Sequence, residues 1–145
     1  MDSKEMVGLI ARDLGLTFDM ESGVNTVLIN DQYEITFIDQ EGAVVVMGDV
    51  APATGNFELD YELMKRNFLG LNTGGNTLGI DSRDNEYVLS MILFPGISYE
   101  TLRIRMERFI DAMKTSRQFI EDFQKNPDSK SESGLSMESH GFVRA

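Results

Sequence analysis

An apolar segment followed by a long helical pattern constrains the fold of this chain more than any other feature. Residues 87–94 are apolar except for Ser90, Pro95-Gly96 follow as a turn, and a helical pattern then continues to Phe123. Successive side chains of a strand face opposite sides of a sheet, so both faces of this strand are apolar and both need cover. One helix layer covers one face of an antiparallel sheet. The other face therefore calls for a second layer, a dimer partner or a bound chain.

The long helix carries its apolar residues at alternating steps of four and three, which places them on one buried seam. The seam residues are Leu102, Met106, Phe109, Met113, Ser116, Ile120 and Phe123. Ser98 is placed to cap the N-terminus, Glu100 lies in the first turn, and Asn126-Pro127 ends the helix. Ile104 lies opposite the seam and Phe119 lies on its flank, which indicates contact with something outside this fold.

A short helix is predicted over residues 3–14, with Gly15 at its C-terminal end. Its apolar stripe consists of Met6, Val7, Ile10 and Leu14. Leu9 falls outside this stripe, and Leu16 and Phe18 follow just downstream. These three residues either extend an apolar surface patch or pack into the core, and their spacing leaves both interpretations open.

Three strand-like segments with turn-like connectors come next, at residues 24–30, 33–39 and 43–48. Residues 49–55 contain Pro52 and small side chains, which predicts a loop. A second helix is predicted from a cap at Asn56 to Gly70, with acidic residues early and basic residues late. Its apolar stripe consists of Tyr61, Met64 and Phe68.

The remaining elements complete an α+β fold. Residues 71–76 are a loop rich in glycine and asparagine, residues 77–81 a strand, and residues 82–85 a turn. The predicted order is α-β-β-β-α-β-β-α, a five-stranded antiparallel sheet with three helices in one domain over residues 1–123. Residues 124–145 are rich in serine and lack periodicity, so a disordered tail is predicted there.

Composition narrows the class of protein. A chain of 145 residues with 41% hydrophobic content is one domain, and the absence of cysteine excludes disulfides, thiolate zinc sites and thiol nucleophiles and suits a reducing cytoplasm. Thirteen basic against twenty-four acidic residues give a net charge of −11, which repels nucleic acid and anionic membranes. This acidity either attracts basic partners or simply keeps the protein in solution. We expect neither a membrane span nor a signal peptide, since no long apolar run or basic leader is present.

Methionine is abundant, with nine residues in the chain. Five of them lie on the apolar stripes: Met6, Met64, Met91, Met106 and Met113. Methionine either fills irregular gaps in a core or forms surfaces that accept varied apolar chains. Core filling is the interpretation that the stripes favour.

The sequence contains few residues suited to catalysis. The single histidine, His140, lies in the predicted tail, which removes histidine bases and triads from the folded part. The glycines at 70, 74, 75 and 79 match no phosphate-binding motif, and residues 81–86 resemble a calcium loop only superficially, so both are interpreted as turns. We expect no catalytic residue, no metal and no cofactor, although a pair of carboxylates stays open as an alternative.

The element order and two short motifs resemble a known family. The motifs are LIARDLGL at residues 9–16 and LGID at residues 78–81, the latter ahead of the apolar strand. Over residues 4–123 the chain resembles the class I type III secretion chaperones, the Tir chaperone (CesT-like) family. This resemblance implies a homodimer in the bacterial cytoplasm that binds the N-terminal segment of an effector protein and keeps it non-globular and secretion-competent, without nucleotide hydrolysis.

The resemblance also implies where partners bind. The first helix and first strands of such chaperones contact the effector, which corresponds here to Leu9, Leu14, Leu16, Phe18, Val27 and Ile29. The second helix and the last two strands make or flank the dimer interface, which corresponds here to Phe68, Leu78, Ile80, Met91 and Leu93.

Three other functions are compatible with the sequence. The first is a generic dimeric binding module or adaptor, and a preference for folded partners would identify it. The second is a subunit of a larger assembly, with the uncovered strand face as its contact. The third is a small enzyme that uses a metal with Asp81 or Asp84, which predicts binding of a divalent cation.

Overall fold

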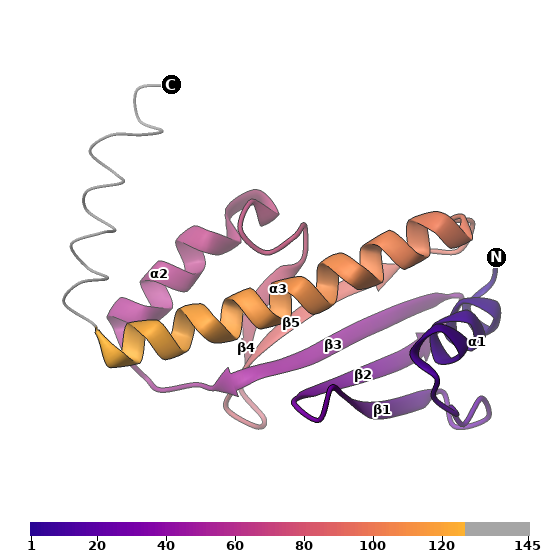
Figure 1. Cartoon of the computed structure of the whole chain (residues 1–145), viewed down its shortest axis with the longest axis horizontal. Helices are drawn as coiled ribbons and strands as arrows, with labels where there is room; N and C mark the ends of the chain where they lie inside the picture. The colour runs from indigo at the N-terminus through magenta and orange to yellow at the C-terminus, as the bar shows by residue number, and fades with distance from the viewer. Residues whose placement is uncertain (127–145) are drawn as a thin grey trace, which may run out of the picture.

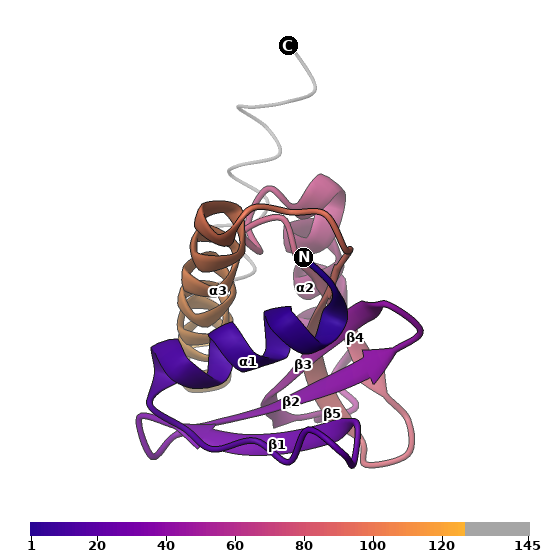
Figure 2. The same ribbon diagram turned by 90° about the vertical axis from the view of Figure 1, so that its right-hand side faces the viewer.

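Five antiparallel strands form one sheet in the order β1-β2-β3-β5-β4, and all three helices lie on one side of it (Figures 1 and 2). This computed structural model describes residues 1–126. The elements are α1 (Ser3–Leu14), β1 (Val24–Ile29), β2 (Tyr33–Gln40), β3 (Ala43–Pro52), α2 (Phe57–Asn67), a 3-10 turn (Phe68–Gly70), β4 (Thr77–Asp81), β5 (Glu86–Leu93) and α3 (Tyr99–Lys125). The predicted α+β class and element order are confirmed. Gln124 and Lys125, predicted as the start of the tail, instead belong to the last turn of α3. The predicted tail from position 127 onward lies outside the described residues, and so does His140.

Strand β5 is apolar on both faces, as the sequence predicts, and only one face is covered by helices. Its inner residues Tyr87, Leu89, Met91 and Leu93 are all buried in the core. On the outer face Val88 is buried, whereas Ile92 is 45% exposed and Phe94, just beyond the strand, is also exposed. The outer face of the sheet is therefore open in the single chain.

Helix α3 lies along the inner face of the sheet (Figure 1). All seven predicted seam residues are buried. The predicted cap is also confirmed, because the Ser98 hydroxyl accepts a hydrogen bond of 3.1 Å from the backbone N–H of Thr101. Ile104 is exposed, and Phe119 is half-buried with the Arg66 guanidinium 4.3 Å above its ring centre.

The backbone of β3 approaches α3 closely at Gly48. A Cβ atom at this position would lie 2.3 Å from Met113 Sδ and 3.3 Å from Phe109 Cε1. Both of those side chains are fully buried, so a side chain at position 48 would force them to repack within the core. The absence of a side chain at Gly48 therefore sets how closely the long helix packs on the sheet.

Arg117 of α3 supports the end of the sheet where β2 and β3 separate. Its guanidinium donates hydrogen bonds to the carbonyl oxygens of Val50 (2.9 Å), Gln32 (2.9 Å) and Asp49 (3.3 Å). It also lies 4.5 Å from the centre of the Tyr33 ring. One side chain thus satisfies three backbone carbonyl groups at this end of the sheet.

The predicted loop over residues 49–55 is wrong in its first half, because β3 continues through Pro52. Residues Ala51 and Pro52 pair with Tyr87 and Glu86 of β5, after an irregularity in register between Asp49 and Ala51. Proline lacks a backbone N–H, but it stands at the last position of the strand, where no ladder bond from it is needed. Pairing with a distant strand outweighs the local loop signal.

Helix α2 begins at its predicted Asn56 cap, but its predicted stripe does not face the core. Leu59 and Leu63 are the buried residues of α2, whereas the stripe of Tyr61, Met64 and Phe68 is exposed. The interpretation of Met64 as a core residue is therefore wrong, while Met6, Met91, Met106 and Met113 are buried as that interpretation requires. The physical reason is that α2 packs on the margin of the sheet, over β4, so that only one narrow side of the helix is covered.

The glycine loop and the last hairpin are turns, as predicted. Gly70, Gly74 and Gly75 all have positive φ angles, which glycine adopts without steric cost. In the β4–β5 hairpin the Arg83 guanidinium lies 3.0 Å from the Asp81 carboxylate. Hydrogen bonds from Arg83 lower the pKa of Asp81 below its ordinary value. Within residues 1–126 no group of three or more acidic, histidine or cysteine side chains is arranged to hold a metal ion.

Candidate binding surfaces

A groove of about 370 Å³ lies between α1 and α3. Its floor is apolar, and its rim carries charged side chains. The floor consists of Ile10, Leu14, Leu102, Met106 and Ile110, and the rim of Asp13, Tyr99, Arg103 and Glu107. Helix α1 is held rigid beside it by a capping box between Asp2 and Glu5 and by Gly15, which ends the helix in the left-handed conformation.

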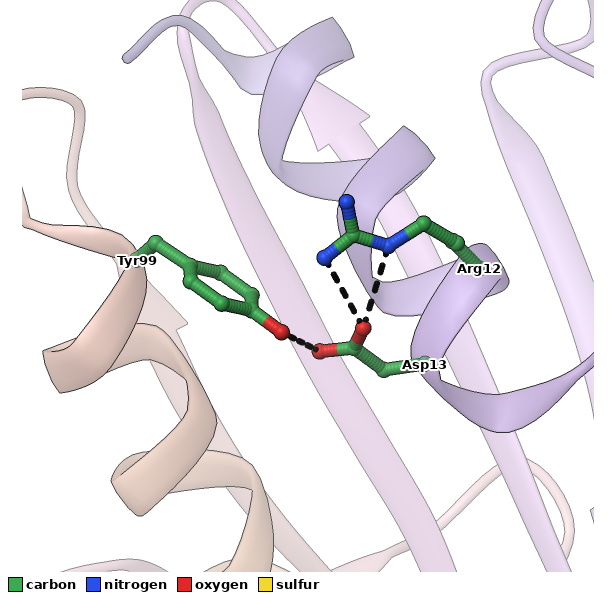
Figure 3. Close-up of polar contacts among 3 residues, drawn as sticks. All are labelled: Arg12, Asp13 and Tyr99. Atoms are coloured by element: carbon green, nitrogen blue, oxygen red, sulfur yellow. Dashed lines mark hydrogen bonds and ion pairs between the residues drawn. The ribbon is translucent and has the colours of Figure 1, made fainter.

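The rim is fixed by three side chains, shown in Figure 3. The Tyr99 hydroxyl donates a 2.8 Å hydrogen bond to Asp13, and the Arg12 guanidinium donates to the other oxygen of the same carboxylate at 3.1 Å. The hydrogen bond from Tyr99, followed by that from Arg12, lowers the pKa of Asp13. This cluster joins the end of α1 to the start of α3 at the rim of the groove.

Only one of the six predicted effector-contacting residues, Leu14, lines this groove. Leu9, Leu16 and Val27 are half-buried against the core. Phe18 and Ile29 are buried, and the Phe18 ring lies 5.2 Å from the Phe37 ring. The structure therefore brings Leu14 together with residues that the sequence interpretation missed: Tyr99, Arg103 and Ile110. Ile110 carried a signal, since it follows the seam residue Met106 by four positions.

Strand β1 forms one edge of the sheet, beside β2 (Figure 2). One side of its backbone pairs with β2, and the other side pairs with no strand within residues 1–126. Val24 and Leu28 of this strand are exposed. An unpaired edge of this kind accepts an extended segment of another chain through backbone hydrogen bonds.

A second exposed apolar surface lies on α2 and β4 and is called the α2 patch. It consists of Phe57, Tyr61, Met64, Phe68 and Ile80, and Met64 is 73% exposed. A small groove of about 110 Å³ separates the helix from β4 within it. Of the predicted dimer residues, Phe68 and Ile80 lie on this patch, whereas Leu78, Met91 and Leu93 are buried in the core of the chain itself.

The outer face of the sheet has an acidic half. Glu34, Asp49 and Glu86 lie there, as the burial of their strand neighbours on the inner face requires. Burial, followed by repulsion from nearby carboxylates, raises the pKa of Asp49 and the pKa of Glu86. Glu34 and Asp84 are among the carboxylates that raise the pKa at both positions.

We expect Asp49→Asn to stabilise the protein near neutral pH by about 0.5 kcal/mol, a small gain because the group is partly exposed. A raised pKa means that folding disfavours the ionised form of Asp49. The ionised carboxylate therefore lowers the free energy of unfolding at neutral pH, and this effect disappears as the pH falls below the ordinary value of 3.8. Urea unfolding of variant and wild type should therefore differ near neutral pH and coincide below that value. Asp111→Asn on the exposed side of α3 is the control. A destabilised Asp49→Asn protein at neutral pH would contradict the assignment.

These surfaces define a protein-binding domain, with an apolar groove, an open sheet edge and an exposed helix patch as its distinguishing features. The chain belongs to the Tir chaperone protein (CesT) family, whose model matches residues 7–117. The resemblance noted from the sequence is thereby confirmed. The family is one of chaperones.

Solved structures share the fold. The ExsC-ExsE complex aligns with a TM-score of 0.62 and 15% identity over 81% of this chain and 96% of that chain. The HopA1-SchA chaperone-effector complex aligns with a TM-score of 0.62 and 18% identity, covering 80% of this chain and 96% of that chain. The Yersinia pestis type III secretion chaperone SycH, in complex with a fragment of YscM2, aligns with a TM-score of 0.58 and 21% identity over 77% of this chain and 97% of that chain.

A comparison with curated proteins by sequence found no match. Within residues 1–126, every helix is too short or too polar to cross a membrane.

Proposed function

We propose that this chain is a type III secretion chaperone that binds the N-terminal segment of an effector protein in the bacterial cytoplasm. The observation that carries this proposal is the apolar groove between α1 and α3, with its mouth fixed by Asp13 and Tyr99. Membership of the Tir chaperone protein (CesT) family and the shared fold with the HopA1-SchA chaperone-effector complex support it. Its action is binding without catalysis.

The surfaces suit a chain that is held without folding. The groove accepts apolar side chains or a short helix, and the open edge of β1 accepts extended backbone. Ordering a flexible segment costs free energy, so the contacts need to extend over a large area. A partner chain that uses groove and edge together is prevented from forming its own compact core.

We assign the α2 patch to a homodimer. Phe57, Tyr61, Met64 and Phe68 recur at steps of four, three and four, so they form one continuous exposed stripe. Exposed apolar patches of this kind mark interfaces, and a two-fold interface uses the same patch on both copies. Two copies then present two grooves to a single effector chain.

We expect Leu14→Asp to weaken effector binding at least tenfold, because it places a charge on the apolar floor of the groove. The protein is co-expressed with an N-terminal segment of about 100 residues from a candidate effector, a length that spans two protomers when extended. Light scattering and limited proteolysis then measure complex formation and protection of the segment. Leu14 is half-buried, so it is a better test than the buried Phe18, whose replacement would disturb the core.

Two variants separate the parts of this proposal. Ile104→Asp introduces the same charge at an exposed position of α3 outside the groove and should bind the segment like wild type. Met64→Asp should give a monomer while its groove remains intact. A wild-type protein that fails to protect any non-globular segment, or a Leu14→Asp protein that protects it fully, would refute the proposed function.

A further inference from the structure

The outer face of the sheet is divided into an apolar half and an acidic half. Cross-strand register places Val24 beside Ile38, Ile38 beside Val45, and Val45 beside Ile92. These four residues form a continuous row over β1, β2, β3 and β5, and the helices lie on the opposite side of the sheet (Figure 2). Val24 and Ile92 at the ends of the row are exposed, and Ile38 and Val45 between them are half-exposed.

The acidic half lies four residues further along the same strands. Glu34 is four positions from Ile38, and Asp49 is four positions from Val45. At about 3.3 Å per residue, the acidic groups lie about 13 Å from the apolar row. Between the two rows lie Thr26, Thr36, Met47 and Ser90, which pair with one another across the same four strands.

The charge of the acidic half is not neutralised within residues 1–126. Arg117 lines the same cavity as these carboxylates, but its guanidinium donates hydrogen bonds to three backbone carbonyl groups and forms no ion pair with them. Neither Asp49 nor Glu86 forms an ion pair in this part of the chain. A net charge of −11 adds a negative field over the whole molecule.

We infer that this outer face binds a second part of the effector segment, in which apolar residues are followed about 13 Å further on by lysine or arginine. This inference rests on the proposed function and specifies the chemistry of the partner. A distance of about 13 Å corresponds to roughly nine residues of a helix or four residues of an extended chain. A second copy of this chain is disfavoured as the occupant, because it brings the same acidic groups.

The position of the face explains how one chain reaches both surfaces. The groove between α1 and α3 is on the helical side of the sheet, and the outer face is on the other side (Figure 2). Strand β1 is the free edge of the sheet at which the helical side and the outer face meet. A segment that pairs with β1 therefore passes from one surface to the other without leaving the protein.

Designed peptides test the inference without knowledge of the effector. The probe is a helical peptide of about 16 residues with leucines at one end and two lysines about nine positions away. The matched peptide carries glutamates in place of the lysines. We expect the lysine peptide to bind the full chain at least tenfold more tightly at low salt, and added salt to reduce the difference. In a methyl-labelled sample it should shift the Ile38, Val45 and Ile92 resonances and leave Ile104 unchanged.

Variants of the protein separate the contribution of the acidic groups from that of the apolar row. The double variant Glu34→Gln/Glu86→Gln should reduce the preference for lysine to less than about threefold, and Ile92→Ser should weaken both peptides equally. Asp111→Asn on α3 is the charge-matched control and should keep the full preference. Absence of lysine-peptide binding, equal binding of the two peptides, or shifts confined to the α1/α3 groove would overturn the inference.

Binding of the effector segment by these variants distinguishes a failure of the outer-face inference from a failure of the proposed chaperone function. If Leu14→Asp loses the effector segment while the Glu34→Gln/Glu86→Gln protein binds it like wild type, the chaperone function stands and the outer-face inference is wrong. If the outer-face variants bind the segment at least tenfold more weakly, the inference is supported in the natural complex as well.

Discussion

Replacing Gly48 by valine is expected to lower the free energy of unfolding by about 3 kcal/mol. The new side chain would have to occupy space that Met113 and Phe109 already fill, since a Cβ atom alone would lie 2.3 Å from Met113 Sδ. Both neighbours are fully buried beneath α3. The helix would therefore have to move away from the sheet, or both side chains would have to leave their rotamers.

Gly79 provides a matched control for this substitution. It also lies in a strand, but no atom lies within 4 Å of the position that its Cβ would occupy. Valine favours strands more than glycine does, so Gly79→Val should be neutral or slightly stabilising, by up to about 1 kcal/mol. Urea unfolding of both variants measures the two effects. Similar losses of stability at both positions would show that packing against Met113 is not the cause.

Replacing Arg117 by methionine is expected to lower the free energy of unfolding by about 3 kcal/mol, because three charge-assisted hydrogen bonds to backbone oxygens are lost. Methionine keeps much of the aliphatic length of the side chain, so the loss measures the guanidinium and not the stem. Arg117→Lys should recover only part of the stability, since one ammonium group cannot reach three carbonyl groups arranged around a planar fork.

Arg108→Met on the same helix is the control for the change in net charge. Arg108 is exposed, and its replacement should change stability by less than about 0.5 kcal/mol. Hydrogen exchange adds a local readout. Amides at the ends of β2 and β3 should lose protection in Arg117→Met, while the amides of β5 next to β4 keep theirs. Uniform loss of protection over the sheet would indicate a global role instead.

Features carried by strong local periodicity were predictable from the sequence. The seam of α3, its Ser98 cap and the exposure of Ile104 follow from spacing alone, because a helix of 27 residues repeats its pattern many times. Strand β5 was recognisable because its apolar run is bounded by turns. The apolar stripe of α2 was predictable, but its burial in the core was predicted wrongly. Periodicity shows that a helix face is apolar and does not show what covers that face.

Features created by contacts between distant residues were not predictable. The extension of β3 through Pro52 depends on its pairing with Glu86, which no local signal encodes. The groove depends on the packing of α1 against α3, which also brings Asp13 to Tyr99, 86 residues later in the chain. Leu14 was identified through the family resemblance, whereas its partners Tyr99 and Ile110 required the packing of α1 against α3.

The strand order also determines when this protein can finish folding during its own synthesis. Strands β1, β2 and β3 are neighbours in sequence and in space, so they can pair soon after they leave the ribosome. Strand β4 cannot join them, because β5 has to lie between β3 and β4. Until residues 86–93 have emerged, β3 keeps an unpaired edge of apolar residues. A member of a chaperone family thus passes through a stage in which it exposes the kind of segment that chaperones bind.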